Sequence, residues 1–584
     1  MFVRAKKRGE RTYLMIVENN WVDGKVRQKV LHNLGRLDVL QGSGRLDALF
    51  HSLGRFSRDL DALGAHRRGE SLATRTRRIG PALIFERLWR ELGMDRVLKN
   101  LLAERKFGFD VERAVFLTVL HRLFDPGSDR AAEKWKERCA VAGAERLALQ
   151  HLYRAMAWLG SPLPREEQRG ATLFAPRRVK ELIEERFFEL KRDLFTRLDV
   201  AFFDTTSICF EGEGGESLGR RGHSKDHRPD LKQMVAGVVL DHEGRPICSE
   251  MWPGNTADVR SLIPVVDRLR EQFEAGNVSI VADRGMIDEG TIRQIEKREW
   301  KYILGARMRL VKEVREEVLS RGGRYEEVHP KSRIKKDPSP LKVKEVWTGD
   351  EKEGARRRHI VYLNEDQAEK DRSDREAIVA ALRDALKRGD KSLVGNKGCR
   401  RYVRASGRRF TIDEEKVKSE ARYDGKWALT TNMDLSARQV ALKYKQLWMV
   451  EEMFRTMKSL LETRPICHKC DETIRGRVFC SFLALVLRKE LQDRLEAKGW
   501  PLEWRDVVGD LDELVEMEIS VKGKGYIVRS ETKGAVGKVA KACAAALPPV
   551  LRPLDTAGRA RATTDSKAPH GAASRSRQAG RVWH

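Results

Sequence analysis

The sequence YKQLWMVEEMFRTMK, residues 444–458, holds the pattern from which the rest of this chain is best interpreted. Wound as one α-helix at 100° per residue, it brings Tyr444, Glu451, Arg455 and Lys458 into a single narrow arc. The opposite face collects apolar side chains, namely Met449, Val450, Met453, Met457, Leu460 and Leu461. The pattern predicts a helix that buries one side in a core and presents a carboxylate among cations on the other.

Glu451 is the acid that this arc singles out. A carboxylate beside two cations and a phenol suits a metal ion held against a phosphodiester, because the carboxylate ligates the metal while the cations meet phosphates. The neighbouring Glu452 lies about a quarter turn away on the same helix. An ordinary exposed helix with i,i+4 Glu–Arg pairing explains the same residues, so the helix alone leaves both interpretations open.

Two upstream segments each end a strand-like apolar run with an aspartate. One is VAFFDTTS at 200–207, which contains Asp204, and the other is VSIVADRG at 278–285, which contains Asp283. An acid at the end of a buried strand is fixed by the sheet and faces whatever lies over its edge. Either aspartate alone is explained by a helix N-cap or an Asx turn. With Glu451 they supply three hard oxygen ligands from separate elements, as a pair of Mg²⁺ ions requires.

The set of Asp204, Asp283 and Glu451 resembles the catalytic triad of DDE transposases, whose core has a ribonuclease-H-like fold. Two loops carry the same resemblance, GHSKDHRPDLKQ at 222–233 and PGNT at 253–256, and so does the stretch from Arg464 to Leu487. The resemblance implies that the triad holds two Mg²⁺ ions, for which Mn²⁺ can substitute, and that all three acids are catalytic.

The helix itself resembles the YREK signature of bacterial insertion-sequence transposases of the family-four group. The match runs from Tyr444 to Lys458, but Leu447 stands where the signature has arginine. The resemblance implies that Tyr444 and Lys458 contact phosphates near the cleaved DNA end. The phosphate contact that this arginine makes in the family is either missing here or supplied by Arg455 or Lys445.

Five side chains are therefore predicted to bind DNA: Tyr444, Arg455, Lys458, Lys225 and Arg284. Lys225 lies in the charged, glycine-flanked loop at 222–233. That loop could close over the metal site or grip the cleaved strand, and it could equally be a solvated loop without a role.

Charge and hydropathy agree with a nucleic-acid partner. Lys and Arg number 114 against 87 Asp and Glu, so the formal net charge of the 584 residues is +27. Such an excess favours a polyanionic partner, and nucleic acid is the usual one. The sequence lacks an apolar run of about 18 residues, and its N-terminus lacks the apolar core of a secretory signal. We expect a cytoplasmic protein without a membrane partner, associated with the nucleoid when bound to DNA.

The eight cysteines do not form the framework of a disulfide-rich protein in a chain of this length. Cys467 and Cys470 have the spacing of half a zinc site, CHKC, and Cys480 is the only further thiol nearby. Two ordinary thiols in a reducing compartment explain the motif better than structural zinc.

The predicted fold is a multidomain α/β protein: a ribonuclease-H-like mixed sheet with flanking helices, interrupted by a β-rich insertion and preceded by a helical domain. The expected segments are 1–75, an N-terminal β-hairpin module; 76–196, a helical domain that binds the DNA end; 197–309 and 431–498, the catalytic core; 310–430, the insertion; 499–555, a C-terminal region; and 556–584, a disordered basic tail.

Individual elements are expected as follows. In the core, we predict strands at 200–204, 232–240, 246–252, 278–283 and 301–305, with helices at 257–273 and 287–298. In the insertion, we predict strands at 343–347, 359–363, 400–403, 408–412 and 427–431, with a helix at 375–387. In the first module, we predict strands at 13–18 and 26–31 around an Asp-Gly turn. In the insertion, Trp347 and Trp427 are candidates for stacking a flipped base, although burial in a core is the better expectation for each.

The predicted function is that of an insertion-sequence DNA transposase. It would bind terminal inverted repeats, hydrolyse the phosphodiester at the element end and join the 3′-hydroxyl to target DNA, as a homodimer on double-stranded DNA. Two alternatives stay open: a transposase-derived DNA-binding protein that no longer cuts, and a ribonuclease-H-like nuclease with another role.

Overall fold

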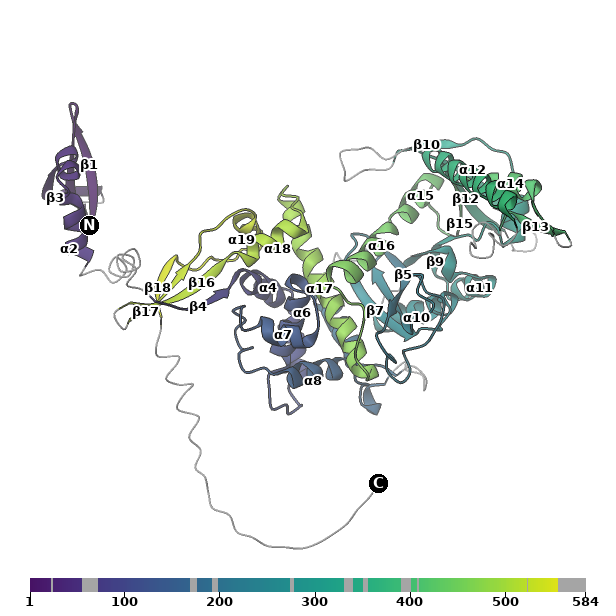
Figure 1. Ribbon diagram of the computed structural model, residues 1–584, viewed down its shortest axis with the longest axis horizontal. Helices are drawn as coiled ribbons and strands as arrows, with labels where there is room; N and C mark the ends of the chain where they lie inside the picture. Colours follow the sequence, from purple (N-terminus) through teal and green to yellow (C-terminus); the bar gives the residue numbers. More distant parts are fainter. Residues whose placement is uncertain are drawn as a thin grey trace, which may run out of the picture. The chain divides into compact units, whose positions relative to one another are not determined.

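The computed structural model describes residues 1–22, 25–54, 72–168, 176–191, 198–273, 278–329, 340–349, 356–389, 401–406, 409–521 and 524–554 (Figure 1). The chain forms two compact units. The first combines Met1–Gly80, Arg138–Ala140 and Trp504–His584, and the second combines Pro81–Glu137 and Val141–Glu503. The predicted tail at 556–584 lies outside the described residues. None of the described helices has the length and apolar character that a membrane-spanning segment needs.

The first unit opens with a three-stranded antiparallel sheet. Its strands are β1 (Phe2–Arg8), β2 (Arg11–Val22) and β3 (Lys25–Arg36), followed by α1 (Leu37–Gly42) and α2 (Arg45–Gly54). The two predicted strands lie within β2 and β3, and the predicted Asp-Gly turn falls on residues outside the described ranges. β1 was not predicted, because every side chain of FVRAKKR is exposed and the strand therefore lacks an apolar alternation.

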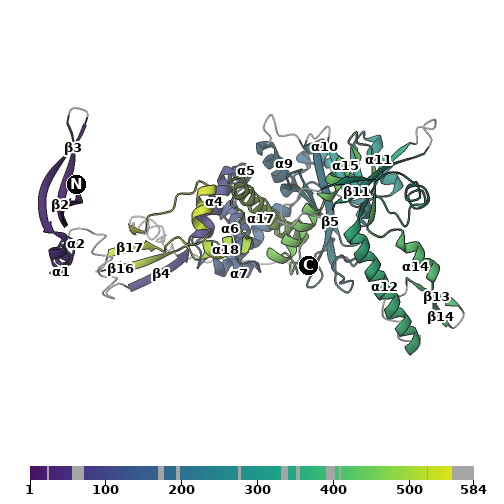
Figure 2. The ribbon, with the colours of Figure 1, turned by 90° about the horizontal axis from the view of Figure 1, so that it is seen from above.

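The same unit also joins residues from both ends of the chain in one sheet. Its strand order is β18-β17-β16-β4, and β4 pairs antiparallel with β16 (Figure 2). The strands are β4 (Leu72–Arg78), β16 (Val515–Val521), β17 (Lys524–Arg529) and β18 (Leu551–Pro553), and the helices are α18 (Trp504–Asp512) and α19 (Val536–Ala542). Such a long-range pairing leaves no local signal in the sequence.

A nine-stranded mixed sheet dominates the second unit, with the order β10-β11-β12-β15-β9-β8-β5-β6-β7. All five predicted core strands are present: β5 (Val200–Cys209), β6 (Gln233–Leu240), β7 (Pro246–Pro253), β8 (Ser279–Ala282) and β9 (Lys301–Gly305). β8 pairs parallel with both β5 and β9, whereas β5, β6 and β7 form an antiparallel meander. A mixed α/β architecture is thus confirmed.

Helices α10 (Leu262–Gln272) and α11 (Glu289–Lys297) lie where helices were predicted and pack against this sheet. Their apolar stripes, for example Val266 and Ile295, join strand residues such as Phe203 and Ile280 in one buried cluster. At roughly 1.5–3 kcal/mol for each large apolar side chain, this burial stabilises the centre of the sheet. The strand ends beside this core are therefore held in fixed positions.

The strands of residues 310–430 extend the central sheet. β15 (Lys426–Thr431) pairs with β9, and β12 (Arg357–Asn364), β11 (Leu341–Thr348) and β10 (Glu326–Val328) follow in order. β13 (Val403–Ser406) and β14 (Arg409–Ile412) form a separate ribbon, and the helices described in this range include α12 (Glu365–Arg388) and α14 (Glu414–Ala421). The predicted β-rich segment thus continues the sheet that carries Asp204 and Asp283.

A helical region precedes and follows the sheet in sequence. It comprises α4 (Gly80–Glu91), α5 (Met94–Leu102), α6 (Val111–Phe124), α7 (Asp129–Trp135), α8 (Leu149–Gly160), α9 (Val179–Lys191) and α17 (Asp471–Ala497). α8 and α17 touch backbone to backbone: a Cβ on Gly476 would lie 2.0 Å from the Met156 carbonyl oxygen, and one on Gly160 would lie 2.0 Å from that of Glu472. Glycine at both positions lets the two helices approach this closely.

Replacing Gly476 with alanine is therefore expected to lower the free energy of unfolding by about 1–3 kcal/mol or more, because backbone cannot yield as a side chain would. Thermal unfolding followed by circular dichroism measures the change. Gly108→Ala is the matched control in the same unit, since a Cβ there meets open space. Equal melting temperatures for the two variants would show that the close approach of α8 and α17 is not required.

Candidate functional site

The pairing of β5 with β8 brings Asp204 and Asp283 together. The parallel register matches Phe203 with Ala282, and the two aspartates come next on their strands. Asp204 lies within β5, which continues to Cys209, so the prediction that it ends the strand was wrong. Asp283 does follow the last residue of β8 and begins η3 (Arg284–Met286). Two acids predicted separately thus occupy neighbouring positions on adjacent strands.

Asp204 is held in a largely buried environment. Its Oδ1 accepts a hydrogen bond from its neighbour's backbone, Thr205 N, at 2.7 Å, and the Nζ of Lys225 lies 3.7 Å from the same oxygen. Burial raises the pKa of Asp204 to about 6, the nearby Lys225 opposes that rise, and the negative charges of Asp283 and Asp258 add to it. The site therefore favours a cation beside this carboxylate.

Asp258 is a third acid at this place that the sequence analysis missed. It begins η2 (Asp258–Arg260), its Oδ1 accepts a hydrogen bond from Thr205 Oγ1 at 2.8 Å, and its Oδ2 lies 3.2 Å from Lys225 Nζ. A Cβ on Gly285 would lie 3.6 Å from that Oδ2, so Asp258 also borders the turn after Asp283. Asp258 follows the PGNT motif by two residues and ends no strand, so periodicity gave no signal for it.

The hydroxyl of Tyr444 is bound to the second acid. It donates a hydrogen bond to Asp283 Oδ1 at 2.9 Å, and burial together with the Asp283 charge raises the pKa of Tyr444 well above its usual value. Gly305, at the end of β9, makes room for this contact, because a Cβ there would lie 2.5 Å from the hydroxyl oxygen. The tyrosine predicted to contact DNA thus orients a carboxylate in the free protein.

Aromatic side chains from β12 and β15 support Tyr444. The ring of Tyr362 lies 6.4 Å from that of Tyr444 and stacks on Trp427 at 5.2 Å with an interplanar angle of 9°. Trp427 is half-buried in this stack. Trp347 was expected in the core, but it is 37% exposed on a strand near the sheet edge, where Arg356 lies over its ring at 4.4 Å.

The segment predicted as one helix is divided in three. α15 (Ala437–Lys445) and α16 (Trp448–Arg455) are separate in Figure 1, and a π-helix at Thr456–Leu460 follows. Hydrogen bonds three residues back tighten the chain at Gln446 and Leu447, and the π-turn widens it again, so 100° per residue does not hold throughout. The prediction of one continuous helix was therefore wrong.

The apolar side of this segment is mostly as predicted. Val450, Met457 and Leu461 are buried, Met449 and Met453 are half-buried, and Leu460 is 42% exposed. Leu447, which replaces the arginine of the signature, is itself buried. Glu451 and Arg455 are exposed on α16, which packs beside β5 and β6. The role of Glu451 as third ligand stays a prediction.

The basic residues predicted to bind DNA have different surroundings. Lys225 donates hydrogen bonds to Thr205 O at 2.7 Å and Thr205 Oγ1 at 2.8 Å, in addition to its contacts with the acids. Lys458 donates to Asp226 Oδ1 at 2.8 Å. Arg284 is exposed directly after Asp283, and its carbonyl accepts a hydrogen bond from Arg307 Nε at 2.9 Å.

The acids offer the hard oxygen donors that Mg²⁺ prefers. Across the described ranges, no group of three or more His, Cys, Asp and Glu side chains is close enough to hold a metal ion. The Nζ of Lys225 between Asp204 and Asp258 nevertheless shows that the cluster accommodates a positive charge. The oxygens of Asp204 and Asp258 thus lie where a cation is already accommodated, and they are of the type that a divalent ion takes.

The CHKC motif has another role in the structure. His468 Nε2 lies 2.9 Å from Asp129 Oδ2, while the exposed Cys467 contacts Glu211 through its Sγ at 3.6 Å. Arg122 and Arg477 also lie beside the buried Asp129, at 3.5 Å each. The histidine thus belongs to a buried ion cluster around Asp129.

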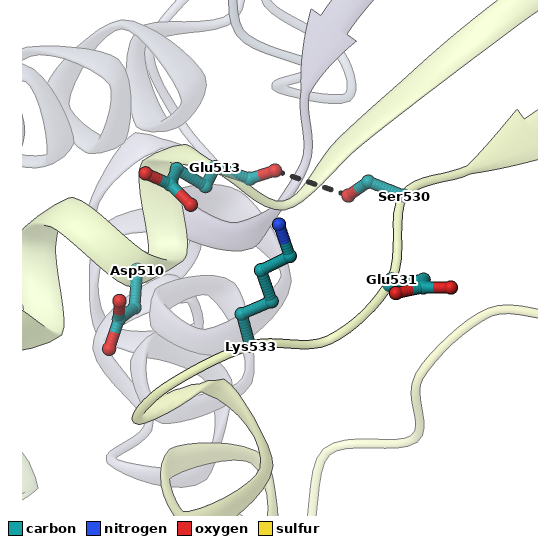
Figure 3. A pocket seen from close by; sticks show the side chains of 5 residues that line it. All are labelled: Asp510, Glu513, Ser530, Glu531 and Lys533. Carbon is teal, nitrogen blue, oxygen red and sulfur yellow. Dashed lines mark hydrogen bonds between the residues drawn. The ribbon is translucent and has the colours of Figure 1, made fainter.

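A cavity of about 300 Å³ lies in the other compact unit. Asp510, Glu513, Ser530, Glu531 and Lys533 line it (Figure 3). Ser530 Oγ donates to the Glu513 carbonyl at 3.1 Å, and Asp510 accepts a hydrogen bond from Ala535 N at 2.6 Å. Three carboxylates against one ammonium do not suit the binding of a polyanion in this cavity.

Two sequence families match the chain. Residues 196–487, half of the chain, match the family described as the transposase DDE domain, and residues 2–64 match the N-terminal domain of IS1634 family transposases. No curated protein matches the chain.

Two solved transposase structures resemble parts of the chain. A cryo-electron-microscopy structure of a piggyBac transposase synaptic complex with hairpin DNA superposes with a TM-score of 0.35 at 11% identity, covering 74% of this chain and 79% of that chain. A Mos1 transposase paired-end complex with the left transposon end gives a TM-score of 0.14 at 14% identity, covering 34% of this chain and 61% of that chain.

The raised pKa of Asp204 predicts a pH-dependent change in stability. The folded chain keeps its proton up to about pH 6, whereas the unfolded chain loses it near the ordinary value of 3.8, so stability falls as pH rises through this window. Asp204→Asn should therefore raise the free energy of unfolding at pH 7.5 by roughly 1–3 kcal/mol, and the gain should shrink towards pH 4. Thermal unfolding of both proteins across pH 4–7.5 in a metal chelator checks this, and a pH-independent difference would contradict it.

Proposed function

The chain belongs to the DDE transposase family, and we propose that it is an insertion-sequence transposase that cuts DNA at the element ends and joins them to a target. The observation that carries the proposal is the fixed pairing of Asp204 with Asp283 on neighbouring parallel strands. The strand order β7-β6-β5-β8-β9 supports a ribonuclease-H-like core. Membership of the family-four group, suggested by the spacing from Tyr444 to Lys458, is part of the same proposal.

Asp204, Asp283 and Glu451 would hold two Mg²⁺ ions, with Mn²⁺ as a substitute. When bound, such ions supply Lewis-acid activation of the attacking oxygen and charge neutralisation at the phosphate. Asp204 and Asp283 are held for this task by the sheet and by hydrogen bonds from Thr205 N and Tyr444. Glu451 is carried on α16, which packs on the strand of Asp204.

The proposed reaction needs no nucleophile from the protein. Water attacks the phosphorus at the element end, the bond to the 3′ oxygen breaks, and the departing oxygen takes up a proton to become a 3′-hydroxyl. That hydroxyl then attacks a target phosphodiester, forms the new bond and releases a target 3′ oxygen. Since one phosphodiester is exchanged for another in the second step, no energy source is required.

Cationic side chains around the acids would hold the DNA backbone. Lys225, Arg284, Arg455 and Lys458 lie on four segments that border the cluster or follow Glu451, and phosphate contacts supply most of the affinity of such interfaces. The partners would be double-stranded terminal inverted repeats and target DNA. Two ends must be joined together, so a homodimer on DNA is proposed. Residues 76–196 are the proposed end-binding region.

Glu451→Gln tests the third ligand. We expect Mg²⁺-dependent nicking of a labelled duplex, ending in the inverted repeats that flank the gene, to fall at least about 100-fold. Glu452→Gln is the matched control, because Glu452 is the adjacent exposed acid on α16, and it should cut at the native rate. Specific binding without cutting by the native chain would favour a silent DNA-binding relative, and random cutting would favour another nuclease.

Tyr444→Phe tests whether the hydroxyl orients Asp283. Loss of one hydrogen bond to a ligating carboxylate is expected to weaken Mn²⁺ binding by about tenfold, measured by calorimetry without DNA. Tyr302→Phe is the control, since Tyr302 is also a buried tyrosine of this sheet and donates at 2.6 Å to a carboxylate outside the site, Glu296. If Tyr444→Phe bound Mn²⁺ with native affinity, the hydroxyl would not be needed to orient Asp283, and DNA contact would be its remaining proposed role.

A further inference from the structure

Residues 223–232, the last part of the loop between β5 and β6, are fixed mostly by polar contacts. None of the side chains at 223–232 is fully buried. Ser224 Oγ accepts hydrogen bonds from the backbone of Asp226 at 3.3 Å and of Arg228 at 3.1 Å. His227 has a φ of 56°, in the left-handed region that a side chain with a Cβ rarely adopts. The loop can therefore change shape without losing a buried apolar contact.

Lys225 turns from this loop towards the acids. Its Nζ lies 3.2 Å from Asp258 Oδ2 and 3.7 Å from Asp204 Oδ1, and it donates to two oxygens of Thr205. The side chain is 30% exposed, so the ammonium has given up part of its hydration for these oxygens. Lys225 thus neutralises the carboxylates that a divalent cation would need.

Asp226, the next residue, turns towards two cations that follow α16 in the chain, Lys458 and Arg464. Its Oδ1 accepts from Lys458 Nζ at 2.8 Å, and its Oδ2 lies 2.5 Å from Arg464 Nη1. The side chains of Asp226 and Lys458 are only 12% and 11% exposed. The Arg464 contact lacks hydrogen-bond geometry, which leaves the buried Oδ2 without a well-directed donor. Two cations therefore share a single carboxylate, one oxygen of which has no well-directed hydrogen-bond donor.

We propose that Lys458 and Arg464 form a binding site for one phosphodiester of the DNA, and that Asp226 fills this site in the free protein while Lys225 occupies the acid cluster. Adjacent residues of one loop would thus stand in for the two ions of the reaction, a metal cation and a phosphate anion. A phosphodiester offers two anionic oxygens to the two cations, as the carboxylate does, and restores the local charge when Asp226 leaves.

This inference rests on the proposed function and adds regulation to it. Because Lys225 and Asp226 are neighbours in the chain, displacement of one loosens the position of the other. Metal binding and DNA binding should therefore favour each other. Whichever binds first loosens the loop, and this lowers the free energy needed for the second to displace its own residue. A free chain would hold both sites closed until metal and DNA are present together.

The test uses the full chain and two probes, Mn²⁺ in calorimetry without DNA and a short duplex of arbitrary sequence in chelator. Lys225→Met should tighten Mn²⁺ binding by about tenfold, and Asp226→Asn should tighten duplex binding by about tenfold. Adding Arg464→Gln to Asp226→Asn should return duplex affinity to the native value or below. Melting temperatures confirm that each variant is folded.

Matched controls come from the exposed Arg228–Asp230 ion pair of the same loop, whose members lie 2.8 Å apart. Arg228→Met and Asp230→Asn change the same charges without touching either site, and each should leave the corresponding affinity within about twofold of native. If Arg228→Met matched Lys225→Met and Asp230→Asn matched Asp226→Asn, the change in net charge alone would explain the affinities, and the inference would be overturned. Unchanged or weaker binding in Lys225→Met and Asp226→Asn would also overturn it.

Failure of the proposed function has a different signature. If neither the native chain nor any variant binds Mn²⁺ or duplex, both proposals fall. If the native chain binds both probes and Asp204→Asn abolishes Mn²⁺ binding, yet Lys225→Met and Asp226→Asn do not tighten binding, only the further inference falls.

Discussion

The parallel pairing of β5 with β8 is the constraint on which the rest of the site depends. It places Asp204 and Asp283 side by side, each directly after a paired residue of its own strand. The two acids cannot move apart, because apolar residues of both strands are buried in one core. The remaining groups are arranged around this pair. Tyr444 fixes one oxygen of Asp283, Thr205 fixes one of Asp204, and Gly305 leaves the space for the tyrosine.

Carboxylates that lie close together repel one another when ionised, so the fold has to offset this repulsion. Burial and the neighbouring carboxylates raise the pKa of Asp204 to about 6, and Lys225 offsets part of this effect. The free protein thus depends on an internal cation that a bound metal would replace. The same loop carries an internal anion, Asp226, against Lys458 and Arg464, so binding and release of both ions are linked through one short segment.

Local patterns in the sequence predicted much of this arrangement. The core strands and helices α10 and α11 follow from apolar runs with breaks at their ends, and the fold bears out those elements and the position of Asp283 after β8, whereas Asp204 lies within its strand. Contacts between distant segments were not predictable in the same way, because neither the pairing of β4 with β16 nor the extension of the sheet through β15 leaves a periodic signal. The position of Asp258 beside Asp204 was missed for the same reason. The helix at 444–458 failed for another reason, since the turn at Leu447 and the π-turn after Arg455 depend on packing that a helical wheel does not contain.

The most direct test of the central claim is the position of Mn²⁺, located by its anomalous scattering in crystals of the full chain soaked with the ion. The account predicts manganese bonded to carboxylate oxygens of Asp204 and Asp283, with Glu451 as a further ligand and Lys225 displaced from Asp204. Manganese at the acidic cavity around Asp510 alone, or at Asp204 and Asp283 with Glu451 still turned to solvent, would contradict it.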